Sequence, residues 1–442
     1  MNTTSLLDPA RPVESPAPSG LSRPAPAWSS GVVDSGGITG MVSSIDADPP
    51  RNSVFSRLLH PRQAHHIPVE FTASGSEYFR IWIVNLLLTF VTLGFYYPWA
   101  KVRKLRYFYA NTQIAGQGLD FHGQPRKMLR GTMLAGVLWA LYSQAMELSA
   151  LSALVAAVLV SALLPALVRA ALQFRLAHTS WRGLRFAFAG NSRKAYAAML
   201  APLVLGLVSL ALLSHDQDVQ ASQLLGLDID QQWINIAALV VFAALLLVAP
   251  YFFWRLKKYQ HDHFRLAQLQ TELRLGAGPV YGVFLRSFGL MALLPLLLGG
   301  IALLAYPGAG KDPGGWLRLT MMLAGIAFLG GMLYFYVVVS PYFQTRMQNL
   351  LWTKTGNRYL RLRSELQFRR YLLLQLKNYL LVTITLGLYW PWAAVATRRL
   401  RLEAVTLVSR IDIDELYMAL RPPSGDAAAD MGDELMGFEL GI

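Results

Sequence analysis

The amino-acid sequence predicts an all-α polytopic membrane protein with six to eight transmembrane helices, internal repeats, and short cytoplasmic β-strands between the helix units. Of its 442 residues, 54% are hydrophobic and only 15% are charged, whereas a soluble chain carries roughly 25% charged residues. Apolar runs of roughly 20 residues, the length that crosses a bilayer as a helix, recur from residue 79 onward. The formal net charge is +14, and the Lys and Arg residues gather in alternate loops, which is typical of membrane topology.

The N-terminal segment, residues 1–66, is predicted to be a disordered cytoplasmic tail. Pro, Ser, Gly and Asp dominate it, and it has no periodic apolar pattern that could nucleate a core. We interpret it as a tether, and residues 421–442 as a second flexible tail. The first long apolar run begins only near Phe79, so no signal peptide is expected. The sequence contains no cysteine, which excludes disulfides and thiolate chemistry.

The domain between the tails, residues 67–420, holds eight apolar segments. They are 79–97, 131–147, 150–168, 196–213, 232–250, 284–305, 317–340 and 371–393. The loops at 101–130, 169–194, 255–286 and 346–370 hold seven, six, six and seven Lys/Arg residues, and the positive-inside rule places them in the cytoplasm. The loops at 143–152, 214–231 and 306–316 hold one Lys between them and are placed outside. The six central segments are therefore expected to pair as three hairpins that enter and leave from the cytoplasm.

The first and last apolar segments leave two alternatives open. Basic residues lie on both sides of 371–393, so a single crossing would leave one Arg cluster outside. Both segments also carry a Thr-Leu-Gly break just before a proline. They are either re-entrant segments that return to the cytoplasm, with protein covering the broken backbone, or ordinary spans in an eight-span protein with both termini outside.

These two segments align with each other at an offset of 293 residues, with twelve identities in 25 positions. The central hairpins carry weaker copies, in which Pro165, Pro250 or Pro341 precedes an Arg by four or five residues. We interpret the chain as five repeat units, each an apolar hairpin, a proline, a basic amphipathic helix and a strand. The units lie near 69–118, 119–183, 184–271, 272–361 and 362–420.

Short β-prone stretches recur in the basic loops. Three of them begin with Thr112, Thr179 and Thr355, each 14 residues after a proline. Other short alternating runs lie near residues 69–71, 272–275, 360–363 and 411–414. Our hypothesis is that these strands gather into a small cytoplasmic sheet or barrel beneath the helix bundle.

One stretch closely resembles a known family. The residues are Glu70 through Trp82, Thr92-Leu93-Gly94-Phe95-Tyr96-Tyr97-Pro98-Trp99-Ala100-Lys101-Val102-Arg103 and Leu105-Arg106-Tyr107-Phe108-Tyr109, and the family is the YjgN family of bacterial inner-membrane proteins. The resemblance covers about residues 69–415 and implies an inner-membrane location. It implies no reaction, because the family is one of unknown function without established catalytic residues. The C-terminal copy departs from the motif, with Ala394 and Ala396 in place of Lys101 and Arg103.

Positions shared by the two terminal segments are the candidates for a pathway or a repeat interface. They are Asn85, Gly94, Pro98, Trp99, Asn378, Gly387, Pro391 and Trp392. An Asn inside an apolar run more often makes an interhelical hydrogen bond. The functional alternative is that the two Asn line a substrate site at a pseudo-symmetric interface, although the repeat is parallel and transporter repeats are often inverted.

The basic residues after the two terminal prolines are the candidates for binding lipid headgroups. They are Lys101, Arg103, Lys104, Arg106, Arg398, Arg399 and Arg401. In the simplest interpretation they only set the topology. In the functional one they bind anionic headgroups, with each charge contributing ~1 kcal/mol near the surface. Nucleic acid is not expected as a partner, because topology already explains where the charge lies.

The sequence predicts neither an enzyme nor a metal or cofactor site. His261 and His263 are two residues apart, not the three or four that place two ligands on one helix face, and no HExxH motif follows. The preferred function is transport or permeation of a small solute. The alternative is a non-catalytic membrane module that binds anionic lipid or a protein partner through its basic cytoplasmic face. Ionisable residues at mid-membrane, which usually mark a transport path, are almost absent from the central spans. The oligomeric state is left unassigned.

Overall fold

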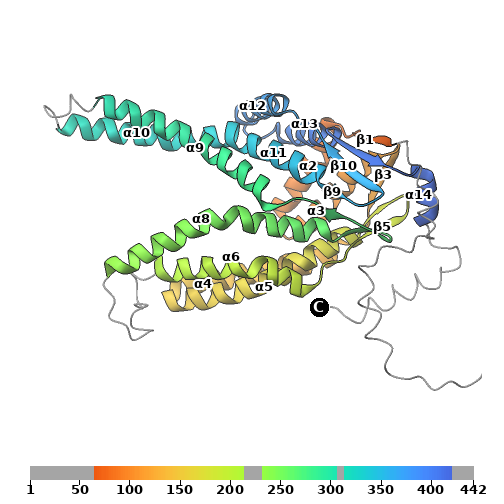
Figure 1. Cartoon of the computed structure of the whole chain (residues 1–442), viewed down its shortest axis with the longest axis horizontal. Coiled ribbons are helices and arrows are strands. Elements are labelled where there is room, and N and C mark those ends of the chain that lie inside the picture. Colours follow the sequence, from red (N-terminus) through yellow and green to blue (C-terminus); the bar gives the residue numbers. More distant parts are fainter. Residues whose placement is uncertain (1–63, 214–230, 306–312, 421–442) are drawn as a thin grey trace, which may run out of the picture. The chain divides into compact units, whose positions relative to one another are not determined.

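The computed structural model describes residues 64–213, 231–305 and 313–420 (Figure 1). Residues 1–63 and 421–442, which hold nearly all of the two predicted tails, lie outside the described residues, as do the loops 214–230 and 306–312. The described chain is mostly helical, but it also forms one 11-stranded sheet in which all pairs are antiparallel. The all-α class predicted from the sequence is therefore wrong, whereas the hypothesis that the short strands gather into one sheet is confirmed.

The length of the strands explains the wrong class. They have between two and seven residues, and a strand that short shows too few alternations to dominate a sequence pattern. The strands are β1 (His65–Phe71), β2 (Thr112–Ile114), β3 (Gln117–Phe121), β4 (Thr179–Trp181), β5 (Leu184–Phe188), β6 (Phe264–Leu266), β7 (Leu269–Gln270), β8 (Glu272–Leu273), β9 (Thr355–Gly356), β10 (Leu360–Ser364) and β11 (Val405–Ser409).

The helices form five hairpins on this sheet. They are α2 (Gly75–Val91) with α3 (Tyr97–Ala110), α4 (Pro125–Leu148) with α5 (Ala150–Ala177), α6 (Ser192–Leu213) with α8 (Gln231–Asp262), α9 (Ala277–Ala305) with α10 (Pro313–Tyr334), η3 (Phe335–Val339) and α11 (Ser340–Thr353), and α12 (Phe368–Ile384) with α13 (Trp390–Glu403). Each hairpin joins two strands that pair at the helix end, with the registers Phe71↔Thr112, Phe121↔Thr179, Phe188↔Phe264, Leu273↔Thr355 and Ser364↔Val405. Every described hairpin therefore leaves the sheet from the end of one strand and returns at the neighbouring end of the strand that pairs with it.

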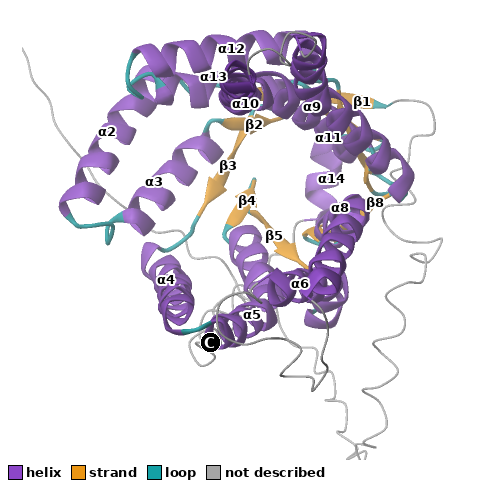
Figure 2. Cartoon of the chain, turned by 90° about the vertical axis from the view of Figure 1, so that its left-hand side faces the viewer, coloured by secondary structure: helices purple, strands orange, loops and turns teal. Residues whose placement is uncertain are grey.

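The two edge strands of the sheet follow one another directly in the chain. Its strand order is β7-β6-β5-β4-β3-β2-β1-β11-β10-β9-β8, so β7 and β8 are its two edges. A single residue, Thr271, joins these edges, and its backbone N donates to the carbonyl of Phe264 at 2.8 Å. Figure 2 shows the strands following one another around the resulting ring.

A buried proline lies 14 residues before the returning strand in every hairpin. These prolines are Pro98, Pro165, Pro250, Pro341 and Pro391. Because a helix rises 1.5 Å per residue, each returning helix covers roughly 20 Å between its proline and the sheet. At Thr112, Thr179 and Thr355 the hydroxyl donates to the carbonyl four residues earlier, which satisfies an acceptor at the helix end.

Five of the described helical segments are long and apolar enough to cross a membrane. They are Leu151–Ala177, Ser192–Leu212, Asn235–Asp262, Ala277–Ile301 and Thr320–Thr353. The predicted span 131–147 lies in α4, which packs against α5 but has a lower mean hydropathy because it begins with Arg126, Lys127 and Arg130. The predicted number of six to eight spans is therefore not reached among the described residues.

The first and last predicted segments form hairpins that are shorter than a span. Helices α2 and α12 have 17 residues each, about 25 Å, and end at turns from which α3 and α13 run back to the sheet. Because both ends of each hairpin lie on paired strands, neither continues to the far side. This geometry agrees with the re-entrant alternative and disagrees with eight ordinary spans.

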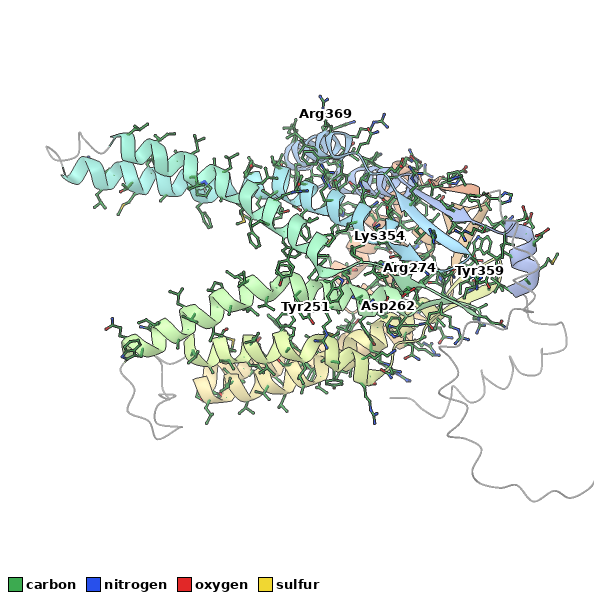
Figure 3. All side chains as sticks on the ribbon, viewed as in Figure 1. Tyr251, Asp262, Arg274, Lys354, Tyr359 and Arg369 are labelled. Carbon is green, nitrogen blue, oxygen red and sulfur yellow. The ribbon has the colours of Figure 1, made fainter. Side chains whose placement is uncertain are left out.

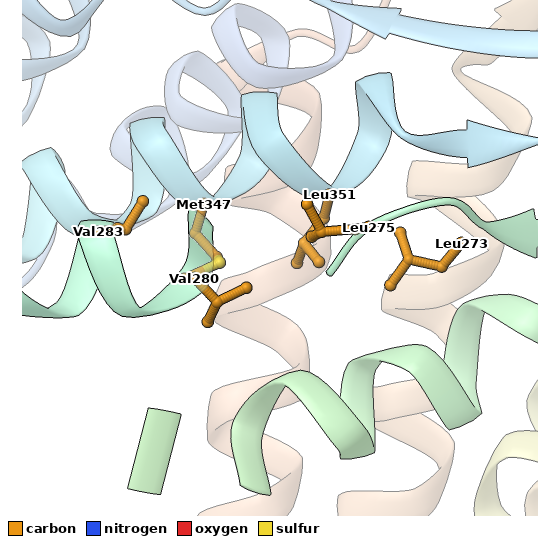
Figure 4. Close-up of a cluster of buried hydrophobic side chains, with 6 residues drawn as sticks. All are labelled: Leu273, Leu275, Val280, Val283, Met347 and Leu351. Atoms are coloured by element: carbon orange, nitrogen blue, oxygen red, sulfur yellow. The ribbon is translucent and has the colours of Figure 1, made fainter. Parts of the chain in front are cut away.

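The buried core lies where the helices meet the sheet, not along the spans. One cluster consists of Leu273, Leu275, Val280, Val283, Met347 and Leu351 (Figure 4). Only 6–22% of the residues in the five span windows are buried. The sheet end therefore has a water-excluding core, whereas the spans leave their apolar surface for lipid.

Helix α14 (Ile413–Leu420) follows β11 and reaches the β4–β5 turn, at the end of the sheet away from the hairpins. Arg182 in this turn forms an ion pair with Asp414. Its guanidinium also lies over the ring of Tyr417, 5.7 Å from the centroid. Leu416 is 1% exposed, so the apolar face of α14 is buried against the protein.

Candidate functional site

The two repeated asparagines hold their hairpins together. Asn85 is 7% exposed, and its Nδ2 donates to the carbonyl of Ala100 across the α2–α3 hairpin at 3.4 Å. Asn378 is 4% exposed, and its Nδ2 donates to the carbonyl of Ala393 at 3.4 Å and to Thr397 Oγ1 at 3.1 Å. Within the described ranges, the Oδ1 atoms of both residues have no hydrogen-bond partner. The donor contacts are those of a helix–helix clamp, and each asparagine lies in its own hairpin.

Gly94 and Gly387 form the hairpin turns. Their φ angles are +92° and +93°, a left-handed conformation that favours glycine, and the residues before them are also left-handed. Each glycine N–H donates to a carbonyl of the preceding helix at 2.8 Å, which ends that helix. Leu93 and Leu386 at the tips are 91% and 94% exposed. Apolar side chains so placed would be unfavourable in water, and they suit a membrane interior.

The prolines and tryptophans of the repeat position the two hairpins. Pro98 and Pro391 are buried in the first turns of α3 and α13. A backbone N–H at this position has no acceptor within the helix, so proline loses no hydrogen bond there. Trp392 stacks on Phe79 of α2 with ring centroids 4.9 Å apart. Trp99 stacks on Tyr96 within its own hairpin, with centroids 6.2 Å apart. Trp392 therefore links the first hairpin to the last, whereas Trp99 does not.

The structure separates the seven basic candidates into two groups. Four make other contacts or none of this kind: Lys101 lies over the ring of Tyr97, Arg106 donates to the carbonyl of Gly123, Arg399 donates to the carbonyls of Phe71 and Ala73, and Arg103 is exposed, as Lys104 also is. The other three are linked through Arg398: its guanidinium lies over the ring of Phe108 in α3, its charge adds to burial in lowering the pKa of Lys104, and the charge of Arg401 adds to burial in lowering the pKa of Arg398 itself. This linked group joins α3 to α13, helices that are almost 300 residues apart in the sequence.

Arg175 of α5 completes this group, and we name Lys104, Arg175, Arg398 and Arg401 the basic cluster. Arg175 also lies within electrostatic reach of Arg398, and its Nε donates to the hydroxyl of Tyr109 at 3.0 Å. It was not among the sequence candidates. A signal was present, because Arg175 and Arg401 both lie ten residues after a repeat proline.

The basic cluster holds unbalanced positive charge. No ion pair to a carboxylate links any of its four residues within the part of the chain that the structure describes. The Arg398 guanidinium lies over the ring of Phe108, 4.8 Å from its centroid, and Arg401 Nε donates to Gln348 Oε1 at 2.7 Å. Burial lowers the pKa of Lys104, and the charge of Arg398 lowers it further. Burial also lowers the pKa of Arg398. An anion bound here would offset the repulsion between Lys104 and Arg398.

The two histidines that the sequence places together have separate surroundings. His261 Nδ1 lies 3.0 Å from Thr355 Oγ1, whereas His263 Nδ1 lies 2.8 Å from the carbonyl of Tyr259. Among residues 64–213, 231–305 and 313–420, no group of three or more His, Asp or Glu residues is placed to hold a metal ion.

Comparison with known proteins gives one family and several relatives. The family described as bacterial protein of unknown function (DUF898) matches residues 66–436. The inner membrane protein YjgN of Salmonella typhimurium is 29% identical over 157 residues, which are 35% of this chain and 40% of that protein. The inner membrane protein YjgN of Escherichia coli K12 is 36% identical over 124 residues, which are 27% of this chain and 30% of that protein. The chain thus aligns with less than half the length of these curated relatives. No solved structure matches it.

Proposed function

Because the chain belongs to the DUF898 family of bacterial proteins of unknown function, and is a multi-pass protein of the inner membrane, we propose that it is a non-catalytic module that binds anionic phospholipid headgroups. The observation that carries the proposal is the basic cluster, in which three helices bring four cations together without a carboxylate partner among the described residues. A phosphodiester group supplies the missing negative charge and accepts several charge-assisted hydrogen bonds.

The depth of the cluster supports a lipid ligand. Helix α5 has 28 residues, about 42 Å. With its first residue at the outer boundary of a hydrocarbon layer of about 30 Å, about 12 Å of the helix projects on the inner side. Counted from their repeat prolines, Lys104 and Arg398 correspond to residues 171 and 172 of α5, close to where this projection begins. Both side chains then lie at the headgroup layer, while the apolar tips at Leu93 and Leu386 lie in the hydrocarbon.

The test is lipid binding by the full chain in phosphatidylcholine nanodiscs that contain increasing phosphatidylglycerol, with bound lipid counted by native mass spectrometry. The variant Lys104→Gln/Arg398→Gln loses two charges, each contributing about 1 kcal/mol near an anionic surface, so we expect roughly thirtyfold weaker binding. The matched control, Arg358→Gln/Arg410→Gln, removes two exposed charges elsewhere and keeps the wild-type affinity. Equal affinity for both double variants contradicts the proposal.

Permeation of a small solute remains a second candidate. The nearly closed sheet favours it, since the five described hairpins stand around its strands. The composition of the spans counts against it, because each apolar window holds at most two charged residues. Flux of a solute panel into liposomes that contain the full chain separates the two: flux that the Lys104→Gln/Arg398→Gln variant retains favours permeation over headgroup binding.

A further inference from the structure

A second basic site lies at the seam of the ring, next to the edge strand β8. A pocket of about 180 Å³ is lined by Arg274, Thr353, Lys354, Thr355, Gly356, Asn357 and Arg361. Figure 3 labels Arg274 and Lys354, which lie near each other at the strand end of α11. A water molecule occupies roughly 30 Å³ of liquid, so the pocket has room for a phosphate group and part of the compound that carries it.

The donors in this pocket are largely unused. Within the described parts of the chain, Lys354 Nζ, the Arg361 guanidinium and Asn357 Nδ2 have no hydrogen-bond or ion-pair partner. Arg274 is partly used, because its Nε bonds Glu272 Oε2 at 3.1 Å. The nearby Asp262 is already occupied by Lys258 and by the backbone N–H of Leu273. The pocket therefore presents three cations and an amide against one exposed carboxylate.

The backbone fixes the turn that carries Asn357 and the strand that carries Arg361. Asn357 Oδ1 accepts hydrogen bonds from the N–H groups of Tyr359 and Leu360, at 2.9 and 2.7 Å, so its amide nitrogen has a fixed direction. A Cβ on Gly356 would lie 2.7 Å from the carbonyl of Leu360 and 2.9 Å from Arg361 Cα. Only a glycine at position 356 lets the strand that carries Arg361 approach this closely.

The position of the pocket selects a soluble ligand. The helical segment Thr320–Thr353, which contains an apolar window suited to a membrane, has 34 residues, about 51 Å, which exceeds the 40–45 Å of a bilayer with its headgroups. With Thr320 at the outer surface, Thr353 and the pocket beside it lie beyond the inner headgroups. A tilt of about 20° shortens the segment to about 48 Å and leaves this conclusion unchanged.

We propose that this pocket binds the phosphate group of a water-soluble phosphorylated compound on the cytoplasmic side, through Lys354, Arg361 and the amide of Asn357. Lys354 supplies a compact ammonium donor, Arg361 a forked guanidinium donor and Asn357 a neutral amide donor. Together they match the oxygens of a phosphate. This site is separate from the basic cluster, and its occupation does not depend on the lipid proposal.

The experiment is calorimetric titration of the full chain in phosphatidylcholine nanodiscs with inorganic pyrophosphate. We expect saturable binding that weakens with added KCl, and at least tenfold weaker binding in Lys354→Gln/Arg361→Gln. Asn357→Asp keeps the oxygen that anchors the turn but adds a negative charge, so it is expected to abolish binding while the melting temperature stays near that of the wild type. The control Arg358→Gln/Arg410→Gln and the lipid-site variant Lys104→Gln/Arg398→Gln are expected to bind like the wild type.

Three outcomes contradict the proposal. The first is that the wild-type chain shows no binding, or that the Lys354→Gln/Arg361→Gln and Asn357→Asp variants bind pyrophosphate as well as the wild type. The second concerns the source of the phosphate: if pyrophosphate does not bind but phosphatidic acid in the nanodisc does, through Lys354 and Arg361, then the ligand is a lipid and the soluble source is wrong. Loss of pyrophosphate binding in the lipid-site variant alone would also contradict two separate sites.

Discussion

Two leucines of the same chain should respond very differently to truncation. Leu273 in β8 is 1% exposed and lies in the core cluster with Met347 and Leu351, whereas Leu296 in the α9 span is 71% exposed (Figure 4). Full burial of a leucine contributes about 1.5–3 kcal/mol, and the cavity left by Leu→Ala raises the loss to about 2–5 kcal/mol. For Leu273→Ala we expect a loss of that size, which lowers the folding equilibrium constant by roughly a hundredfold at 3 kcal/mol.

Leu296→Ala is the matched control, because it makes the same chemical change on a surface that lipid or detergent covers in both states. Association of helices in a membrane gains nothing from hiding apolar area from water, so we expect a loss under about 1 kcal/mol. Both variants are unfolded by SDS titration in mixed micelles, with circular dichroism as the readout. Equal destabilisation of the two variants would refute the conclusion that the core lies at the sheet end.

Three further predictions concern the hairpins and α14. Asn378→Ala should lower the melting temperature more than Asn85→Ala, because Asn378 donates two hydrogen bonds and Asn85 one; the reverse order would contradict the clamp. Gly387→Ala should cost about 1–2 kcal/mol, because alanine is strained at a φ of +93°; an unchanged melting curve would contradict this. Arg182→Ala should speed proteolysis within α14, and adding Asp414→Ala should have little further effect; additive effects would show that the ion pair does not hold α14.

The sequence predicted the parts of the fold that depend on local composition. Apolar length and the distribution of Lys and Arg predicted the membrane class and the central hairpins, and the prolines marked every returning helix. The re-entrant alternative for the terminal segments also came from local signals, the Thr-Leu-Gly break and the Arg residues on both sides. The internal repeat of five units stays a prediction, although each of them contains a helical hairpin between two paired strands.

The candidate site was predicted only in part. Lys104, Arg398 and Arg401 were selected as basic residues after a proline, but so were Lys101, Arg103, Arg106 and Arg399, which have other surroundings. Sequence spacing could not separate the two groups, because the difference is whether α3 and α13 face each other. Arg175 was missed because its loop was interpreted only as a determinant of topology.

The sequence by itself determined that this chain is a membrane protein, and that the segments between its apolar runs are alternately rich and poor in Lys and Arg, because these properties follow from composition over about 20 residues. Only the tertiary structure decided that the strands form one ring, since pairs such as β1 with β11 join residues more than 300 positions apart. The β1–β11 pairing brings the hairpin that carries Arg398 next to the one that carries Lys104, whereas the β8–β9 pairing places Arg274 beside Lys354. Contacts of this kind are set by which strands pair, and strands of two to seven residues carry too little pattern to reveal their partners.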